Sequence, residues 1–116
     1  MSKRLIRIFA GIFDPQETKA FNYQAGKHQH KAVGVMFSHD TALSLSFQNN
    51  MSLTTSRLEF AYKNEALLTP PGDRIFTIEE DLKNCKVITG TVENLKNVHQ
   101  GGAKKIINIY LLVEEA

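Results

Sequence analysis

A strict alternation of apolar and polar residues constrains this chain more than any other feature of its sequence. Between Thr41 and Gln48, the apolar residues Leu43, Leu45 and Phe47 alternate with alanine and small polar residues. Successive side chains of a β-strand point to opposite faces of a sheet, so this spacing places one face of the segment in a core and the other in water. Similar short runs recur along the chain between turn residues. The pattern predicts a mostly-β protein.

Length and connections narrow the architecture. The chain has 116 residues, and we interpret residues 1–116 as a single β-rich domain with its own core. The segments between the predicted strands are too short for parallel crossovers, so antiparallel sheets are expected. A small OB-like antiparallel β-barrel or a compact β-sandwich fits this pattern. At most one short helix is expected, near residues 78–84, where Thr77 and Glu80 have the spacing of a capping box; the alternative for this segment is a polar turn.

Two runs, Leu5 to Phe13 and Lys105 to Val113, are apolar at nearly every position rather than at alternate ones. Such runs are typical of strands that are covered on both faces. We therefore expect the second run to lie in the middle of a sheet.

The cysteine content indicates the cellular compartment, and the net charge limits the kinds of binding partner. Cys85 is the single cysteine, so the chain has neither an internal disulfide nor a Cys-rich zinc site, and a reducing, cytoplasmic location is expected. The formal net charge of +2 is too small to indicate a dedicated polyanion binder. No stretch approaches the roughly 18 apolar residues that a transmembrane helix needs, so no membrane partner is expected.

The histidines are candidates for a metal site. His28 and His30 would lie on the same side of an extended segment, with His39 and Asp40 one predicted strand away. Three imidazoles and a carboxylate would suit zinc or copper. Exposed polar histidines in a loop are the simpler interpretation, and we predict neither a metal nor another cofactor.

Motifs for catalysis are missing from the sequence. It contains neither a nucleophile elbow nor a glycine-rich phosphate loop. Cys85 lies between Lys83 and Lys86, but a lone cysteine more often packs as a small apolar residue. We therefore predict a protein that is not an enzyme.

The segment 15–31 is interpreted as a long polar loop in which aromatic and basic residues interleave. Proteins that grip single-stranded nucleic acid combine cations along the phosphates with aromatic rings that stack on the bases. The first functional hypothesis is thus a binding module for single-stranded nucleic acid. Its candidate residues are Lys19, Phe21, Tyr23, Lys27, His28, His30 and Lys31 of the 19–31 loop, with Lys104 and Lys105 from a later hairpin. The alternative is that Phe21 and Tyr23 pack into the core while the lysines lie in water.

A second hypothesis comes from residues 32–56, which contain one charged residue, Asp40. We interpret this segment as a strand pair joined by a tight turn at His39–Asp40. Weakly charged strands have little protection against pairing with other strands. The segment therefore predicts a protein–protein interaction or self-assembly module, with another protein or a second copy of the chain as partner.

Overall fold

The computed structural model describes residues 2–38, 40–62, 73–85, 87–96 and 104–115. No residue in these ranges is helical. The chain forms the strands β1 (Ser2–Phe13), β2 (Thr18–Gln24), β3 (Gln29–Ser38), β4 (Thr41–Asn49), β5 (Thr54–Tyr62), β6 (Asp73–Asp81), β7 (Val87–Asn94) and β8 (Lys105–Glu115).

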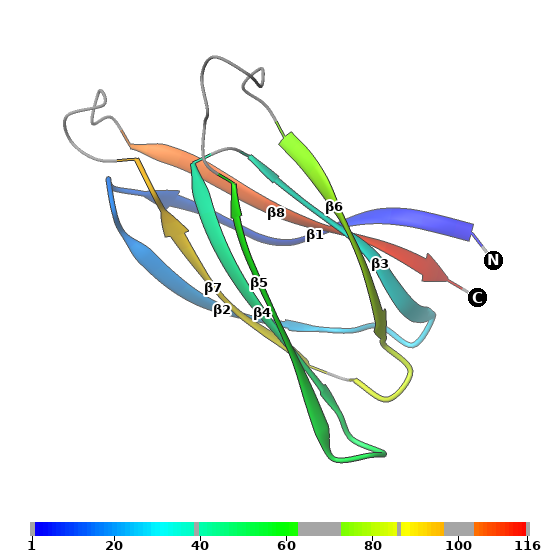
Figure 1. Ribbon diagram of the computed structural model, residues 1–116. Coiled ribbons are helices and arrows are strands. Elements are labelled where there is room, and N and C mark those ends of the chain that lie inside the picture. The colour runs from blue at the N-terminus through cyan, green and yellow to red at the C-terminus, as the bar shows by residue number, and fades with distance from the viewer. Residues whose placement is uncertain (1, 39, 63–72, 86, 97–103, 116) are drawn as a thin grey trace.

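The strands form two four-stranded antiparallel sheets that pack face to face (Figure 1). Sheet I has the strand order β1-β8-β3-β6, and sheet II has the order β2-β7-β4-β5. Every connection passes from one sheet to the other except the β4–β5 hairpin. Eight strands arranged as two interleaved Greek keys make a jelly roll. The prediction of a mostly-β, antiparallel fold is confirmed, in its sandwich form.

The core lies between the two sheets. Leu43, Leu45 and Phe47 of β4 point inward and are at most 2% exposed, as their alternation predicts. The facing strands of sheet I also contribute alternate apolar residues. In β8, for example, every second residue from Ile107 to Val113 is buried. The largest fully buried side chains are Phe13, Phe37, Phe47, Leu43, Leu45, Leu82, Ile88, Ile107, Ile109, Leu111, Val35 and Val92.

The predicted helix near residues 78–84 is wrong. Residues up to Asp81 belong to β6, in which Phe76 and Ile78 are half-buried and their neighbours are exposed. This alternation packs two large apolar side chains against the core, which a short helix would not do. A turn follows, in which Asp81 accepts hydrogen bonds from the Lys83 backbone N–H at 2.8 Å and the Asn84 side chain at 3.1 Å.

The predicted strand pair in residues 32–56 is also wrong. Both strands exist, but β3 lies in sheet I between β8 and β6, whereas β4 lies in sheet II between β7 and β5. The chain crosses between the sheets near Asp40, whose φ is 57°. Each strand thereby buries its own apolar face in the shared core, and neither is an edge strand. The sheet edges are β1 and β6 in one sheet and β2 and β5 in the other. His39 lies outside the described residues.

Candidate functional site

The predicted 19–31 loop contains a strand. Thr18–Gln24 forms β2, an edge strand of sheet II that pairs with β7. Lys19, Phe21 and Tyr23 alternate along it and are half-buried, while the residues between them are exposed. Their Cα partners in β7 are Val92, Gly90 and Ile88, so all three point toward the interior of the sandwich. The aromatic and basic residues alternate here because the segment is a strand, in which every second side chain points to the same face.

Each of these three side chains packs on a neighbour within the fold. The ring of Phe21 stacks on Phe9, with centroids 4.9 Å apart and planes at 27°. The ammonium of Lys19 lies 5.3 Å from the centroid of the Phe13 ring, within the range of a cation–π contact. Phe21 and Tyr23 both pack against the core cluster. This is the arrangement that the alternative interpretation of these aromatics expected.

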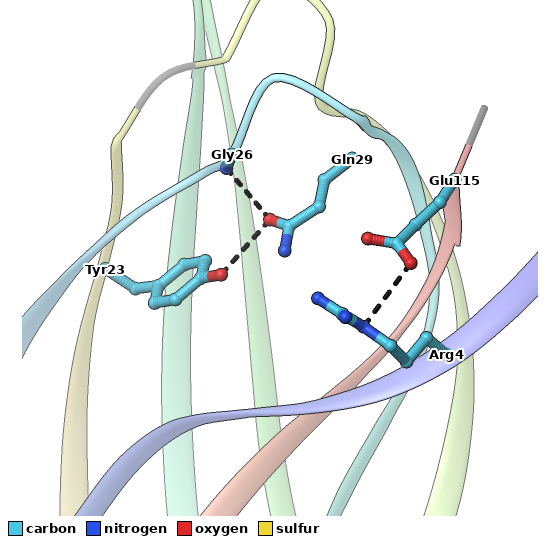
Figure 2. A network of polar contacts seen from close by, with 5 residues as sticks. All are labelled: Arg4, Tyr23, Gly26, Gln29 and Glu115. Carbon is cyan, nitrogen blue, oxygen red and sulfur yellow. Dashed lines mark hydrogen bonds and ion pairs between the residues drawn. The ribbon is translucent and has the colours of Figure 1, made fainter.

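The turn between β2 and β3 is built around a buried amide. Gln29 is 6% exposed, and its Oε1 accepts hydrogen bonds from the Tyr23 hydroxyl at 3.1 Å and the Gly26 backbone N–H at 3.0 Å (Figure 2). These bonds close the turn and leave Lys27 and His28 exposed at its tip. Two of the predicted residues are therefore free to meet a ligand at this end of the molecule.

The remaining predicted residues divide between the two ends of the sandwich. His30 and Lys31 follow the β2–β3 turn, at the same end as Lys27 and His28 (Figure 1). Lys104 and Lys105 precede and begin β8, at the opposite end. The nine predicted residues thus do not form one surface.

The lysines at the two ends differ in environment. Lys31 Nζ donates to Glu79 Oε1 at 2.6 Å, a bond that raises the pKa of Lys31 and lowers that of Glu79. Lys105 is half-buried and donates to the Asp40 carbonyl oxygen at 3.3 Å and to Thr41 Oγ1 at 3.5 Å. Burial lowers its pKa. Lys105 therefore braces the β3–β4 connection, and its ammonium is engaged inside the fold.

No metal site assembles among the described residues. No group of three or more His, Cys, Asp or Glu side chains there lies close enough to hold an ion. His28 is exposed at the turn while His30 is half-buried on β3. Cys85 is 1% exposed, and burial raises the pKa of its thiol, which opposes the thiolate that a nucleophile or metal ligand requires.

The outer face of sheet I carries a surface that the sequence patterns did not single out. Apolar side chains lie on all four strands of this face, although no further layer covers them in this structure. The polar side chains of Arg7, Thr77 and Asn108 lie among them. Leu5 is 43% exposed and Ile75 is 54% exposed, and toward one end Ile12 and Ile106 are 57% and 66% exposed. We call this surface the apolar face; it comprises Leu5, Ile12, Met36, Ile75, Ile106, Tyr110 and Leu112.

The residues of the apolar face are neighbours across the sheet. Leu5 of β1 is the Cα partner of Leu112 of β8, and Met36 of β3 lies between Tyr110 and Ile75 in the same way. A Cβ placed on Gly34 would lie 3.2 Å from side-chain atoms of both Ile75 and Leu112. The two side chains therefore converge over the glycine from the strands on either side, and the apolar face is continuous across β6, β3 and β8.

One end of the apolar face is bordered by a row of charges with alternating sign. Lys3 of β1 is the Cα partner of Glu114 of β8, and Glu114 is also the partner of Lys31 of β3. Lys31 in turn is the partner of Asp81 of β6. Glu79, two residues earlier on the same side of β6, forms the ion pair with Lys31. We call these five side chains the charged row; from β1 to β6 the signs run positive, negative, positive, negative.

The outer face of sheet II is different in chemistry. Two adjoining shallow hollows of about 410 and 300 Å³ cross it and share Ser44, Arg57 and Thr91. Their other outward-facing residues include Ser46 and Thr89. The Arg57 Nε donates to Ser44 Oγ at 3.4 Å and lies 3.6 Å from a carboxylate oxygen of Glu59. The residues that line these hollows are mostly polar, so the extended apolar surface belongs to sheet I.

Fold and surface together define a two-sheet jelly-roll module with one apolar and one polar outer face. The sequence matches no protein-family model and none of the curated proteins. Among solved structures, the VP2 subviral particle of infectious bursal disease virus is similar at a TM-score of 0.51 and 12% identity, covering 98% of this chain. This chain spans 32% of that viral chain. A mutant of the family 29 carbohydrate-binding module CBM29-2 matches at a TM-score of 0.47 and 15% identity, covering 98% of this chain and 86% of the other.

At 12% identity the likeness to the viral chain shows the fold alone. One fold can serve unrelated functions, so the function has to be argued from the surfaces of this chain. No helix in the described ranges is long and apolar enough to cross a membrane.

Proposed function

We propose that this chain is a protein-interaction module that docks a protein partner on the apolar face of sheet I. The observation that carries the proposal is the exposure of aliphatic side chains on β1, β6 and β8, with the half-buried Met36 of β3 between them. An exposed apolar surface that is contiguous and bordered by polar groups is typical of a protein–protein interface.

The sequence pattern of β1 and β8 supports the same function. The runs from Leu5 to Phe13 in β1 and from Lys105 to Val113 in β8 are apolar at nearly every position, as strands between two layers are. In the sandwich only their inner side chains are covered, for example Ile107 and Leu111. Their outer side chains, such as Leu5 and Ile106, are as apolar as buried residues, but no second layer covers them in this structure. A docked partner would supply that layer.

Photo-crosslinking tests the proposal. A benzophenone amino acid placed at Ile75 would lie on the apolar face, and the same amino acid at Thr89 would lie on the polar outer face of sheet II as a matched control. In cells that normally produce the protein, we expect discrete protein adducts from position 75 and none from position 89. Equal labelling from both positions, or none from position 75, would contradict the proposed docking function.

A second candidate function is weak binding of single-stranded nucleic acid at the β2–β3 turn. Its supporting observation is the pair Lys27 and His28, which are exposed at the tip and are followed by His30 and Lys31. The inward packing of Phe21 and Tyr23 leaves this site without the stacking platform that the sequence suggested. We therefore rank it below protein docking.

A further inference from the structure

We infer that the partner of the apolar face is a second copy of this chain, docked on it by the same face. The inference rests on the proposed docking function and names its partner. It is carried by the charged row, because a surface that pairs with itself must present complementary charge to its own rotated image.

A two-fold axis that lies in the plane of the interface and parallel to the strands reverses the order of the strands. Strand β1 of one copy then faces β6 of the other, and β8 faces β3. Positions along the strands are unchanged by this rotation. Residues that lie at the same level of sheet I therefore remain at the same level across the interface.

Under this rotation every member of the charged row meets a charge of opposite sign. Lys3 of each copy faces Glu79 and Asp81 of the other, and Glu114 faces Lys31. The signs match because they alternate across an even number of strands. The same rotation places most of the apolar face on itself, since the level of each residue along the strands is kept. The exception is Arg7, which shares the level of Tyr110, Met36 and Ile75 and faces Ile75 of the other copy from the edge strand β1. Tyr110 of each copy then faces Met36 of the other.

The other in-plane axis, perpendicular to the strands, gives a poorer match. It would place the end of the face that carries Lys3 and Glu114 over the end that carries Ile12 and Ile106. Charged groups would then lose water to aliphatic side chains without gaining a partner, which is unfavourable. Parallel alignment also suits the aligned packing of twisted sheets, whose strands cross at about 30°.

The size of the face is compatible with such a dimer. Four strands at about 4.8 Å spacing, each about ten residues long at about 3.3 Å per residue, present roughly 600 Å² in projection. Side-chain relief adds to this projected area. Interfaces of standard size bury about 800 Å² on each partner. The sheet thus lies at the small end of this range, which is compatible with a dimer of modest affinity.

A charge exchange between two variants tests both the partner and the arrangement. The variants are Lys3→Glu, which makes position 3 repel Glu79 of the other copy, and Glu79→Lys, which makes position 79 repel Lys3. Both positions are exposed, so neither change should prevent folding. Arg57→Glu, on the outer face of sheet II, is the matched control for a change of charge away from the interface.

Sedimentation velocity at low ionic strength provides the readout. We expect the wild-type chain and Arg57→Glu to dimerise. Lys3→Glu and Glu79→Lys should each dimerise with a dissociation constant at least about tenfold higher, because two like-charge contacts replace two opposite-charge contacts. An equimolar mixture of Lys3→Glu and Glu79→Lys should recover dimers, since both symmetric contacts are attractive again in the mixed pair. Added salt should reduce these differences.

Two results would overturn the inference. If the wild-type chain dimerises but the mixture does not recover, the two copies do not face each other in this arrangement. If the wild-type chain stays monomeric at every concentration, the partner is not a second copy. In that second case, adducts from position 75 that contain a different protein would still support docking, whereas loss of those adducts as well would remove the proposed function.

Discussion

Gly90 lies directly beneath the ring of Phe21. A Cβ added to Gly90 would lie 2.5 Å from Cζ of the phenylalanine and 2.9 Å from the Ser44 carbonyl oxygen. The glycine in β7 thus provides the space in which the β2 aromatic packs. This contact is the clearest sign that Phe21 belongs to the interior of the sandwich.

Replacing Gly90 should therefore destabilise the fold. We expect Gly90→Ala to lower the free energy of unfolding by about 1–3 kcal/mol, because the added methyl group forces the ring or the β4 backbone to move. Urea denaturation followed by circular dichroism measures the change. Gly26→Ala is the control, since the nearest atom to its Cβ would be 3.7 Å away, and it should change stability by less than about 0.5 kcal/mol. Equal effects of the two substitutions would contradict the packing described for Phe21.

The Gln29 amide should hold the β2–β3 turn in place. We expect Tyr23→Phe to cost about 1 kcal/mol, because it removes one of the two hydrogen bonds to Gln29 Oε1, and Gln29→Ala to cost more, because it removes both. Denaturant unfolding gives both values. A double-mutant cycle should show that the two changes are not additive, and additive effects would mean that the hydrogen bond contributes nothing to stability.

Glu80 should make stability depend on pH. Burial raises the pKa of this carboxyl, and a hydrogen bond from Ser56 opposes the shift only in part. A raised pKa in the folded state means that the unfolded chain releases its proton first as the pH rises, so the contribution of Glu80 to stability falls as pH increases above the ordinary value of 4.5. We expect Glu80→Gln to lack this fall. Thermal unfolding of both proteins between pH 4 and 7 tests it, and parallel profiles would count against the burial of Glu80.

Nucleic-acid binding at the β2–β3 turn also makes a measurable prediction. If the exposed lysine carries it, anisotropy of a labelled single-stranded oligonucleotide at low salt should show weak binding that Lys27→Ser reduces and Lys104→Ser does not, because Lys104 lies at the other end of the molecule. A loss of binding in Phe21→Ala or Tyr23→Ala should coincide with a loss of folded protein. The absence of a signal at low salt would remove this candidate function.

Much of the fold follows from the period of the sequence. The alternation in Thr41–Gln48 predicts β4 almost to its ends, and the nearly continuous apolar run from Lys105 to Val113 predicts that β8 lies inside a sheet. The β2 strand was missed because its inward positions include Lys19, so its alternation resembles a polar loop. The helix near residues 78–84 was wrong because the capping-box spacing of Thr77 and Glu80 also fits an edge strand that packs Phe76 and Ile78.

Strand pairing and the candidate site were harder to predict from the sequence. The pairing of β3 with β8 and β6 joins segments far apart in the chain, and nothing local in residues 32–56 indicates that its two strands belong to different sheets. The apolar face has a signal in the sequence, namely the outward-facing apolar residues of the first and last strands. That signal was interpreted as full burial, because a strand covered by its own fold and a strand covered by a partner have the same composition.

The most direct measurement is sedimentation equilibrium of the purified chain beside two variants, Ile75→Asp on the apolar face and Thr89→Asp on the polar face of sheet II. The chain has a mass of 13.1 kDa. We predict that the wild type and Thr89→Asp approach twice this mass as concentration rises, and that Ile75→Asp stays at the mass of one chain while melting at a similar temperature. A wild-type chain that remains at 13.1 kDa throughout, or an Ile75→Asp variant that associates like the wild type, would contradict self-docking on the apolar face.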